Sequence, residues 1–282
     1  MKRTRRPAFR RERHGRGRPP RARLHRSAGE AGERIILYGW HTVTAALANP
    51  ARRIRKILAT ENALRRLADD GLALPVEPEL VRPDAIAARL SPDAVHQGLL
   101  VEADPLPSPA LTDLSASGIV LALDQITDPH NVGAILRTAA AFAVAAIVTT
   151  ARHSPEATGV LAKSASGALE CVPIVLVQNL ARALVELKER GFFVVGLDSD
   201  APDDLSAMPP TSPLALVLGA EGKGLRQGTR ALCDRLARLD LPGAIKSLNV
   251  SNAAALALYI ASRGVAKSRG PAQGGPSSII DR

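Results

Sequence analysis

The sequence predicts an α/β protein with a parallel sheet in its C-terminal part and a smaller α/β unit before it. From residue 118 onwards, short apolar runs alternate with segments of helical periodicity. The runs are continuously apolar, which is typical of strands buried on both faces of a parallel sheet that helices cover. The proline-rich stretch DPLPSP (104–109) interrupts the pattern before this region and indicates a linker.

In the N-terminal unit, ordered sequence is expected from Ile35, and the periodicity then changes from one short segment to the next. The expected elements are helix 39–49, strand 54–60, helix 61–69, helix 83–90 and strand 98–101. We therefore expect a disordered basic tail over 1–33, a small domain over 34–104, a linker over 105–117, a sheet domain over 118–267 and a second disordered tail over 268–282.

The C-terminal unit is expected to alternate between buried strands and covering helices. Ligands of such sheets bind beyond the carboxyl ends of the strands, so polar residues in those loops are candidate site residues. Strands are expected at 118–124, 145–150, 172–177, 192–197, 214–218 and 236–241, and helices at 131–144, 157–167, 179–190, 225–233 and 249–264.

The positive charge is concentrated at the N-terminus. Residues 1–26 contain 12 Lys and Arg against the single acid Glu12, so this segment carries +11 and the remaining residues carry −1. Such a segment cannot form a core. We favour attraction to RNA as its role, and the alternatives are a solvated tail without a dedicated partner and a transit peptide.

Composition argues against several classes of protein. Cys171 and Cys233 lie 62 residues apart, a spacing that fits neither a zinc site nor a disulfide framework, and the sequence predicts no metal. No apolar run is long enough to span a membrane, and a cytoplasmic protein with no membrane partner is expected. Aromatic residues make up 2% of the chain, which leaves few platforms on which bases can stack.

Three loops after predicted strands carry most of the unusual polar residues. The first is DQITDPHNVGAILRT (124–138), in which Arg137 stands on an otherwise apolar helix. Arg137 either extends along the helix edge to solvent or is directed at an anionic group. Asn131 stands in the N-cap region of the helix, and His130 before it is more typical of a turn than of a general base.

The second loop is LGAEGKGL (218–225), which is glycine-rich but does not match a phosphate loop. Gly222-Lys223 is followed by Gly224 where a Walker sequence needs Ser or Thr, and the glycine order is also not that of a dinucleotide fold. Glu221 would repel a phosphate. The loop is better suited to enclosing a neutral or cationic ligand, and Lys223 is expected to face solvent or RNA.

The third loop is LPGAIKSLNVSNAAAL (241–256), in which four polar residues crowd the start of a long helix. One cap residue is enough for a helix, so the surplus suggests that amides and hydroxyls face a ligand. The four are Ser247, Asn249, Ser251 and Asn252.

Together these stretches resemble the signature motifs of the SpoU (TrmH-like) family of SPOUT-class RNA 2′-O-ribose methyltransferases. The motifs correspond to NVGAILR (131–137), LVLGAEGKGL (216–225) and SLNVSNAAALALY (247–259), in the family's order and at its spacing. YGWHTVTAAL (38–47) and VHQGLL (95–100) also resemble the small ribosomal-protein-like substrate-binding domain of the subgroup that methylates a guanosine ribose in large-subunit (23S) ribosomal RNA.

The resemblance implies properties that periodicity does not show. These are a deep trefoil knot in the sheet domain, S-adenosyl-L-methionine bound in the knotted loops, and a homodimer with its active site at the subunit interface. The implied reaction is methyl transfer to a ribose 2′-hydroxyl in 23S ribosomal RNA, or alternatively in transfer RNA. A non-catalytic RNA-binding protein and a nucleotide hydrolase are the competing classes. The polar residues of the three motifs disfavour the first, and the missing Walker sequence disfavours the second.

The resemblance also implies roles for individual residues. Arg137 is the implied catalytic residue, which reaches the cofactor of the other subunit and either takes the ribose proton or stabilises the developing oxyanion. Asp240 stands where many members have proline, which changes the local loop. The residues implied to position Arg137 and the ribose are Asn131, Glu221, Ser247 and Asn249, and the implied cofactor-binding residues are Leu218, Gly219, Gly222, Leu239, Leu241 and Leu248.

Overall fold

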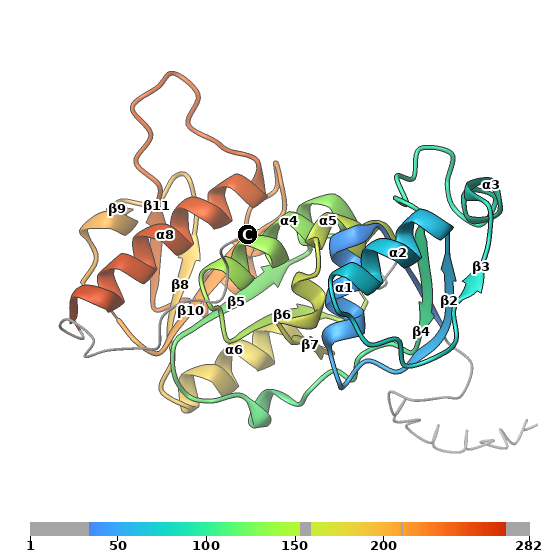
Figure 1. Cartoon of the computed structure of the whole chain (residues 1–282). Coiled ribbons are helices and arrows are strands. Elements are labelled where there is room, and N and C mark those ends of the chain that lie inside the picture. The colour runs from blue at the N-terminus through green and yellow to red at the C-terminus, as the bar shows by residue number, and fades with distance from the viewer. Residues whose placement is uncertain (1–33, 153–158, 210, 269–282) are drawn as a thin grey trace, which may run out of the picture.

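The computed structural model describes residues 34–152, 159–209 and 211–268, and within them two sheets form adjacent units (Figure 1). The predictions for residues 1–33 and 269–282 lie outside the described residues. The last helix continues to Ser268, the first residue of the predicted second tail.

The first sheet has four strands in the order β1-β4-β2-β3. β4 pairs antiparallel with β1 and β2, while β2 and β3 are parallel. The fully buried Leu37, Ile57 and Val101 pack with helices α1 and α2 to form its core. The elements are β1 (Ile35–Tyr38), α1 (Trp40–Ala48), β2 (Ile54–Ala59), α2 (Glu61–Asp69), β3 (Glu79–Leu80), α3 (Pro83–Ala87) and β4 (Leu99–Ala103).

The second sheet has seven strands in the order β7-β6-β5-β10-β8-β11-β9, and every pairing is parallel. The predicted parallel sheet is therefore confirmed. Its elements are β5 (Ile119–Asp124), α4 (Pro129–Ala141), β6 (Ala146–Thr150), α5 (Gly159–Ala165), β7 (Ile174–Val177), α6 (Leu180–Glu189), β8 (Phe193–Leu197), β9 (Asp203–Asp204), β10 (Leu214–Gly219), α7 (Gln227–Arg230), β11 (Arg235–Arg238) and α8 (Val250–Ser268).

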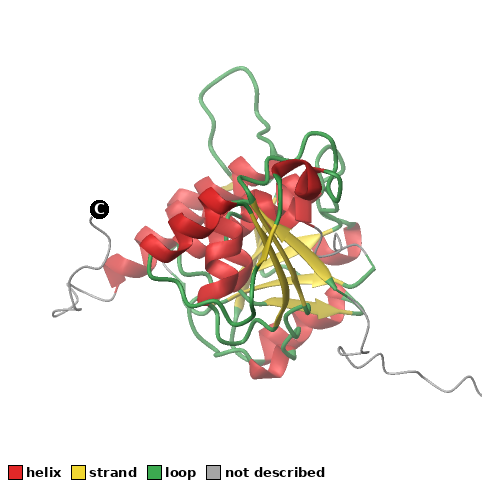
Figure 2. Cartoon of the chain, turned by 45° about the vertical axis from the view of Figure 1, so that its right-hand side comes forward, coloured by secondary structure: helices red, strands yellow, loops and turns green. Residues whose placement is uncertain are grey.

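Helices cover both faces of this sheet (Figure 2). On one face, α4, α5 and α8 bury Ile135, Leu161 and Leu258 against the strands. On the other face, α6 buries Leu184 and Leu187. Burial on both faces explains why these strands are continuously apolar.

Several boundaries differ from the prediction, each for a local reason. The helix predicted over 225–233 is reduced to α7, because Arg226 before it is extended and its backbone N–H is bonded to Asp124. The strand predicted over 236–241 is β11, which ends at Arg238 because its neighbours β8 and β9 offer no further residues to pair with. The short strands β1, β3 and β9 were not predicted.

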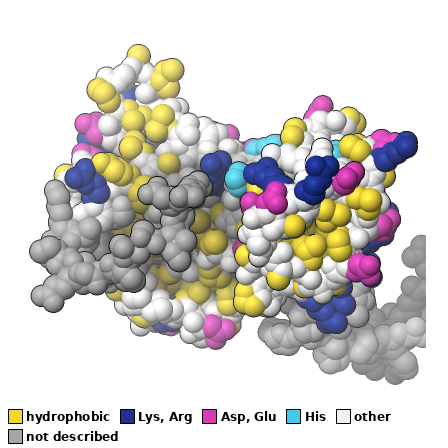
Figure 3. Space-filling model, viewed as in Figure 1, with side chains coloured by type: hydrophobic (Ala, Val, Ile, Leu, Met, Phe, Trp, Pro, Cys, Tyr) yellow, Lys and Arg dark blue, Asp and Glu magenta, His cyan; other side chains and the backbone are white. Residues whose placement is uncertain are grey.

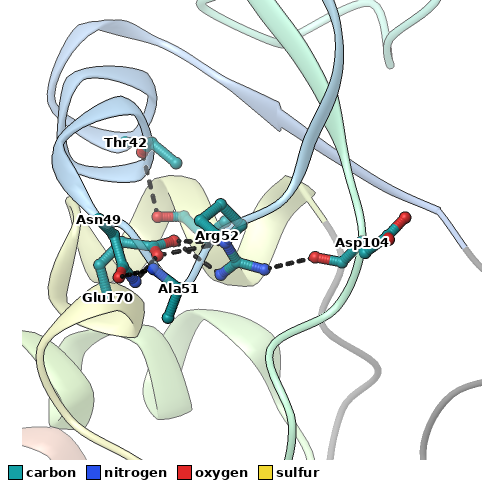
Figure 4. A network of polar contacts seen from close by, with 7 residues as sticks. Thr42, Asn49, Ala51, Arg52, Asp104 and Glu170 are labelled. Atoms are coloured by element: carbon teal, nitrogen blue, oxygen red, sulfur yellow. Dashed lines mark hydrogen bonds and ion pairs between the residues drawn. The ribbon is translucent and has the colours of Figure 1, made fainter. Parts of the chain in front are cut away.

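The small unit is attached to α5 and to the 3-10 turn η2 (Ala168–Glu170) that follows it. The Arg52 guanidinium forms an ion pair with Glu170 at 2.7 Å, and both side chains are at most 5% exposed (Figure 4). Asn49 donates to the same carboxylate at 2.7 Å, and Arg52 also donates to the carbonyl of Asp104 at 2.8 Å. Thr42 donates to the carbonyl of Ala162 on α5. The orientation of the small unit is therefore fixed by a buried and hydrogen-bonded charge pair.

Candidate active site

The loops that the sequence singles out lie at the carboxyl edge of the seven-stranded sheet. β5 and β10 are neighbours, with Asp124 paired to Gly219 at their ends, and β11 lies beyond β8 on the other side of β10. The polypeptide therefore leaves three nearby strands into the loops 125–128, 220–226 and 239–249. This is the edge at which parallel sheets bind their ligands.

Asn249 joins the three loops. Its Nδ2 donates to Asn131 Oδ1 at 3.0 Å and to Glu221 Oε1 at 2.6 Å. Its Oδ1 accepts from the backbone N–H of Ser251 at 2.9 Å, which is the bond expected of a helix cap. One side chain thus caps α8 with its oxygen and holds the other two loops with its nitrogen.

The first turn of α4 presents Asn131 to this cluster. Asp128, and not Asn131, caps the helix by accepting from the backbone N–H of His130 at 3.1 Å. Pro129 suits the first helical position because the N–H it lacks has no partner there. Since Asp128 provides the cap, the Asn131 amide is available to Asn249. His130 is the second residue of α4 and not a turn residue, and its Nδ1 lies 3.3 Å from Ser164 Oγ of α5.

The glycine-rich loop after β10 folds back on its own strand. A Cβ on Gly219 would lie 2.2 Å from the carbonyl carbon of Gly224, so no larger residue fits. Gly222 and Gly224 have positive φ values of 72° and 63°, and neither has an atom within 4 Å of where a side chain would begin. The loop is therefore closed tightly at its base and open on its outer side.

Asp124 and Arg226 fix this loop to β5, a pair that the sequence analysis missed. The Asp124 side chain is fully buried and accepts from Arg226 Nε at 2.6 Å and from its backbone N–H at 3.1 Å. In the sequence, the one feature that could have identified Asp124 is its position as the first polar residue at the end of an apolar strand. The pair holds both ends of the glycine loop against the sheet.

Arg137 and Ser247 do not join the Asn249 cluster within one chain. Arg137 is exposed on α4, six residues after Asn131, and forms no hydrogen bond or ion pair with any residue that the structure describes. Ser247 is exposed in the loop before α8 and makes no such bond either. The structure brings together three of the five predicted catalytic residues, and the role of each remains a prediction.

The predicted cofactor-binding residues surround the same edge. Leu218 is buried at the end of β10, and Leu239 packs partly against the core. Leu241 and Leu248 lie in the loop between β11 and α8, where Leu248 is 39% exposed. Leu239 follows the last strand residue instead of ending the strand, so it belongs to this loop. Asp240 is also in the loop and exposed, and the residues the structure describes offer it no ion pair.

Comparison with known proteins decides the family. The model of the SpoU rRNA methylase family matches residues 118–259, and a model named for RNA 2′-O ribose methyltransferase substrate binding matches residues 36–109. The chain belongs to the SpoU rRNA methylase family. The two matched ranges span the elements of both sheets, so the family assignment covers the small unit as well as the sheet domain.

Two relatives and one solved structure illustrate the similarity. The 23S rRNA (guanosine-2′-O-)-methyltransferase RlmB of Vibrio cholerae is 39% identical over 243 residues, which cover 81% of this chain and 96% of its own. The RlmB of Pseudomonas putida is 38% identical over 238 residues, covering 80% and 95%. The SpoU methyltransferase AviRb from Streptomyces viridochromogenes, solved with AdoMet, superposes with a TM-score of 0.70 over 82% of this chain and 89% of its own; at 23% identity it shows the common fold.

The described residues form neither a metal site nor a membrane-spanning helix. No three His, Cys, Asp or Glu side chains of that part of the chain gather as metal ligands. None of its helices is both long and apolar enough to cross a membrane.

Proposed function

We propose that this protein transfers the methyl group of S-adenosyl-L-methionine to the 2′-hydroxyl of a guanosine ribose in 23S ribosomal RNA. The bonds from Asn249 to Asn131 and Glu221 carry the proposal, because they join one residue from each of the three family motifs at the ligand-binding edge of the sheet. The names of the RlmB relatives support the guanosine and the RNA. A ribosomal RNA substrate agrees with the cytoplasmic location that the sequence predicts.

The residues present fit the cofactor. The outer side of the loop at Gly222 and Gly224 leaves space that side chains would fill, and the loop between β11 and α8 offers the partly exposed apolar residues Leu239 and Leu248. Leu218, Gly219 and Leu241 would complete the site through backbone groups. When bound, S-adenosyl-L-methionine supplies a methyl group that its sulfonium already activates.

The protein's own residues then orient the ribose and manage its proton. Glu221 uses Oε1 to hold Asn249, which leaves Oε2 to accept a hydrogen bond from the 2′-hydroxyl and then to take its proton as the O–H bond breaks. A hydroxyl held in this way would be oriented toward the methyl group of the bound cofactor, and alignment of this kind accounts for much of the rate. Because arginine is a positively charged donor that suits phosphate groups, we assign Arg137 to an RNA phosphate and to the negative charge that develops on O2′.

We further propose that the active protein is a homodimer with the implied trefoil knot in each sheet domain. The exposed Leu256 and Tyr259 of α8 support an interface, since large apolar side chains at 37% and 47% exposure gain from being covered. The exposed Arg137, which has no partner among the described residues of its own chain, is available to the other subunit's site. The fold shared with SpoU structures supports the knot.

The test is methyl transfer from radiolabelled S-adenosylmethionine to 23S ribosomal RNA, followed by mapping of the modified nucleotide. Arg137→Ala is expected to lower the rate roughly 100- to 1,000-fold with unchanged unfolding temperature. Arg182→Ala is the matched control, because Arg182 is also an exposed helical arginine without an ion pair among the described residues. Label in transfer RNA and not in 23S RNA would overturn the ribosomal proposal, and an Arg137→Ala variant at the wild-type rate would overturn the assigned role.

A further inference from the structure

The small unit carries a polar pocket that the proposed chemistry does not use. The pocket has a volume of about 320 Å³ and lies where α1, α2 and the turn before β4 meet. Binding sites for small molecules begin at about 300 Å³, so this pocket has room for one planar ring system. Its polar and aromatic lining comes from Trp40, Thr60, Asn62, Arg66 and Gln97.

A stacked pair forms one wall of the pocket. Arg66 Cζ lies 3.7 Å from the centroid of the Trp40 ring, which is a stacking distance. Trp40 is only 5% exposed, whereas Arg66 is exposed and has no ion pair among the described residues. One face of the guanidinium therefore covers the indole, and the other remains available to a planar ligand.

The hydrogen bonds of the two amide side chains show which groups remain for a ligand. Gln97 Oε1 accepts from the backbone N–H of Trp40 at 2.9 Å and from Lys163 Nζ at 3.1 Å. Asn62 Oδ1 accepts from Arg65 at 3.0 Å. These partners are all donors, which identifies the amide oxygens and leaves both amide NH₂ groups unused by the described residues. The pocket therefore offers donors and favours a ligand edge that carries acceptors.

The backbone around Gln97 is held in a conformation that side chains rarely adopt. Gln97 has φ 54° and Gly98 has φ 77°, and a Cβ on Gly98 would lie 2.4 Å from Thr60 Oγ1. A left-handed conformation at a non-glycine residue costs free energy and persists where the surroundings enforce it. Here it places Gln97 between the pocket and α5 of the sheet domain. Burial at this junction lowers the pKa of Lys163.

We propose that this pocket binds one unpaired base of the RNA substrate, stacked on Arg66, with guanine or uracil preferred over adenine. The inference rests on the proposed function for the identity of the ligand as RNA. Proteins recognise unpaired bases by stacking them on aromatic rings or guanidinium planes and by hydrogen-bonding their edges. Guanine presents the two acceptors O6 and N7 on one edge and uracil presents carbonyl oxygens, whereas adenine places an amino donor beside its acceptor.

The location of the pocket suits an anchor for RNA beside the active site. Lys163 joins Gln97 to α5, and α5 packs against α4, whose first turn carries Asn131. On the face shown in Figure 3, Lys and Arg side chains gather over α1 and α2, with acidic side chains between them. A base held in the pocket therefore fixes a flanking segment of RNA beside the sheet domain.

The fluorescence of Trp40 tests the pocket directly, because it is the single tryptophan of the chain. The full-length protein is titrated with hexauridylate and with hexaadenylate at 0.2 M salt, which weakens attraction to the basic tail. We expect hexauridylate to change the fluorescence and to bind more tightly than hexaadenylate. We expect Arg66→Ala to weaken hexauridylate binding about five- to 150-fold, the range for one stacked base. Equal binding of the two hexamers would overturn the base preference.

Further variants separate stacking, hydrogen bonding and charge. Arg66→Lys keeps the charge and the fold but loses the planar group, and is expected to weaken binding as well. Gln97→Glu keeps the oxygen that holds Trp40 and removes one of the two free NH₂ groups, so the preference for uridine over adenosine should weaken. Arg53→Ala, at an exposed arginine that does not line the pocket, removes one charge and should change binding less than twofold. If Arg66→Ala and Arg66→Lys both bind hexauridylate with the wild-type affinity, the proposal that a base binds in this pocket is wrong.

Steady-state methyl transfer distinguishes this inference from the proposed function. Arg66→Ala is expected to raise the KM for RNA, with the loss lying in KM and not in kcat. If the wild-type protein transfers no methyl group but its binding of hexauridylate still depends on Arg66, the proposed function is wrong and the proposed base pocket stands. If the protein transfers methyl groups but Arg66→Ala changes neither the KM for RNA nor the fluorescence response, the proposed base pocket is wrong and the proposed function stands.

Discussion

At the scale of single residues, Asn249 has two structural roles, capping α8 and joining the loops, that one substitution can separate. Asn249→Asp keeps the oxygen that caps α8 but replaces the donor to Asn131 and Glu221 by a second carboxylate oxygen. We expect the methyl-transfer rate to fall roughly 100-fold, because the loops around the ribose lose their connection and two carboxylates repel. The unfolding temperature should change little, since Asp is as good a cap as Asn.

Two further variants at the start of α8 complete this test. Asn249→Ala removes the cap as well and should also lower stability by about 1 kcal/mol. Asn252→Ala is the control for stability, because Asn252 is an exposed residue of the same helix turn and its side chain forms no hydrogen bond with the described residues. Thermal unfolding and initial rates measured on the same preparations decide between the roles. Full activity in Asn249→Asp would show that the cluster is only structural.

Gly219 gives a second prediction at this scale. In Gly219→Ala, the new methyl group would meet the backbone of Gly224 and Leu225 at 2.2–2.4 Å, so the loop must move outward. We expect a loss of about 1–3 kcal/mol in unfolding free energy and weaker S-adenosylmethionine binding by calorimetry. Gly228→Ala is the matched control, because nothing lies within 4 Å of its Cβ position. Cofactor affinity unchanged in Gly219→Ala would remove this loop from the cofactor site.

The sequence predicts some residues of the site much better than others. Asn131, Glu221 and Asn249 stand in quoted motifs, and the structure brings them together. Asp124 and Arg226 are 102 residues apart, so only the pairing of β5 with β10 reveals their contact. Arg66 and Trp40 likewise meet only after the small sheet has folded.

At the scale of elements, local patterns predict the long strands and helices well and the short ones poorly. Strand β5 and helix α8 have enough apolar residues for their periodicity to identify them. The two-residue strands β3 and β9 have no such signal and exist only because a neighbouring strand offers backbone partners. The end of β11 is likewise set by the length of its neighbours. Local sequence patterns therefore cannot predict elements that form only because a neighbouring strand pairs with them.

The attachment of η2 to the small unit gives a prediction at this scale. Arg52→Met leaves Glu170 as a buried charge without its partner, which should cost about 3–5 kcal/mol of unfolding free energy. Arg52→Met combined with Glu170→Leu should recover part of this loss, because neither charge is then buried alone. Denaturant unfolding of the single and double variants measures the coupling.

The surface pair Arg65–Glu61 provides the control for the buried pair. Its side chains are 68% and 77% exposed, so Arg65→Met should change the unfolding free energy by less than about 1 kcal/mol. An equal effect of Arg52→Met and Arg65→Met would show that the buried pair does not hold the units together. The run ARRIRK (51–56) does not distinguish Arg52 from its exposed neighbours Arg53 and Arg55, which explains why the sequence analysis missed this contact.

At the scale of the whole molecule, charge and chemistry belong to different parts of the chain. The segment 1–26 carries a charge of +11, and the rest of the chain carries −1. The sheet domain and the small unit hold the proposed site and the proposed base pocket, and we expect the N-terminal segment to supply attraction that does not depend on RNA sequence. Affinity and specificity should therefore respond to different variants.

Deleting residues 1–33 tests this division. Each phosphate contact that is lost makes the slope of log K against log salt shallower by about 0.7–0.9, so a tail that contacts several phosphates leaves a clear change in slope. We expect the truncated protein to bind RNA more weakly at low salt, with a shallower slope, and to keep the wild-type preference for hexauridylate over hexaadenylate. A tail of equal length with its 12 Lys and Arg replaced by Gln should behave like the deletion, because charge and not length attracts RNA. Binding slopes that coincide for all three proteins would exclude the tail from RNA binding and leave the small unit as the main contact.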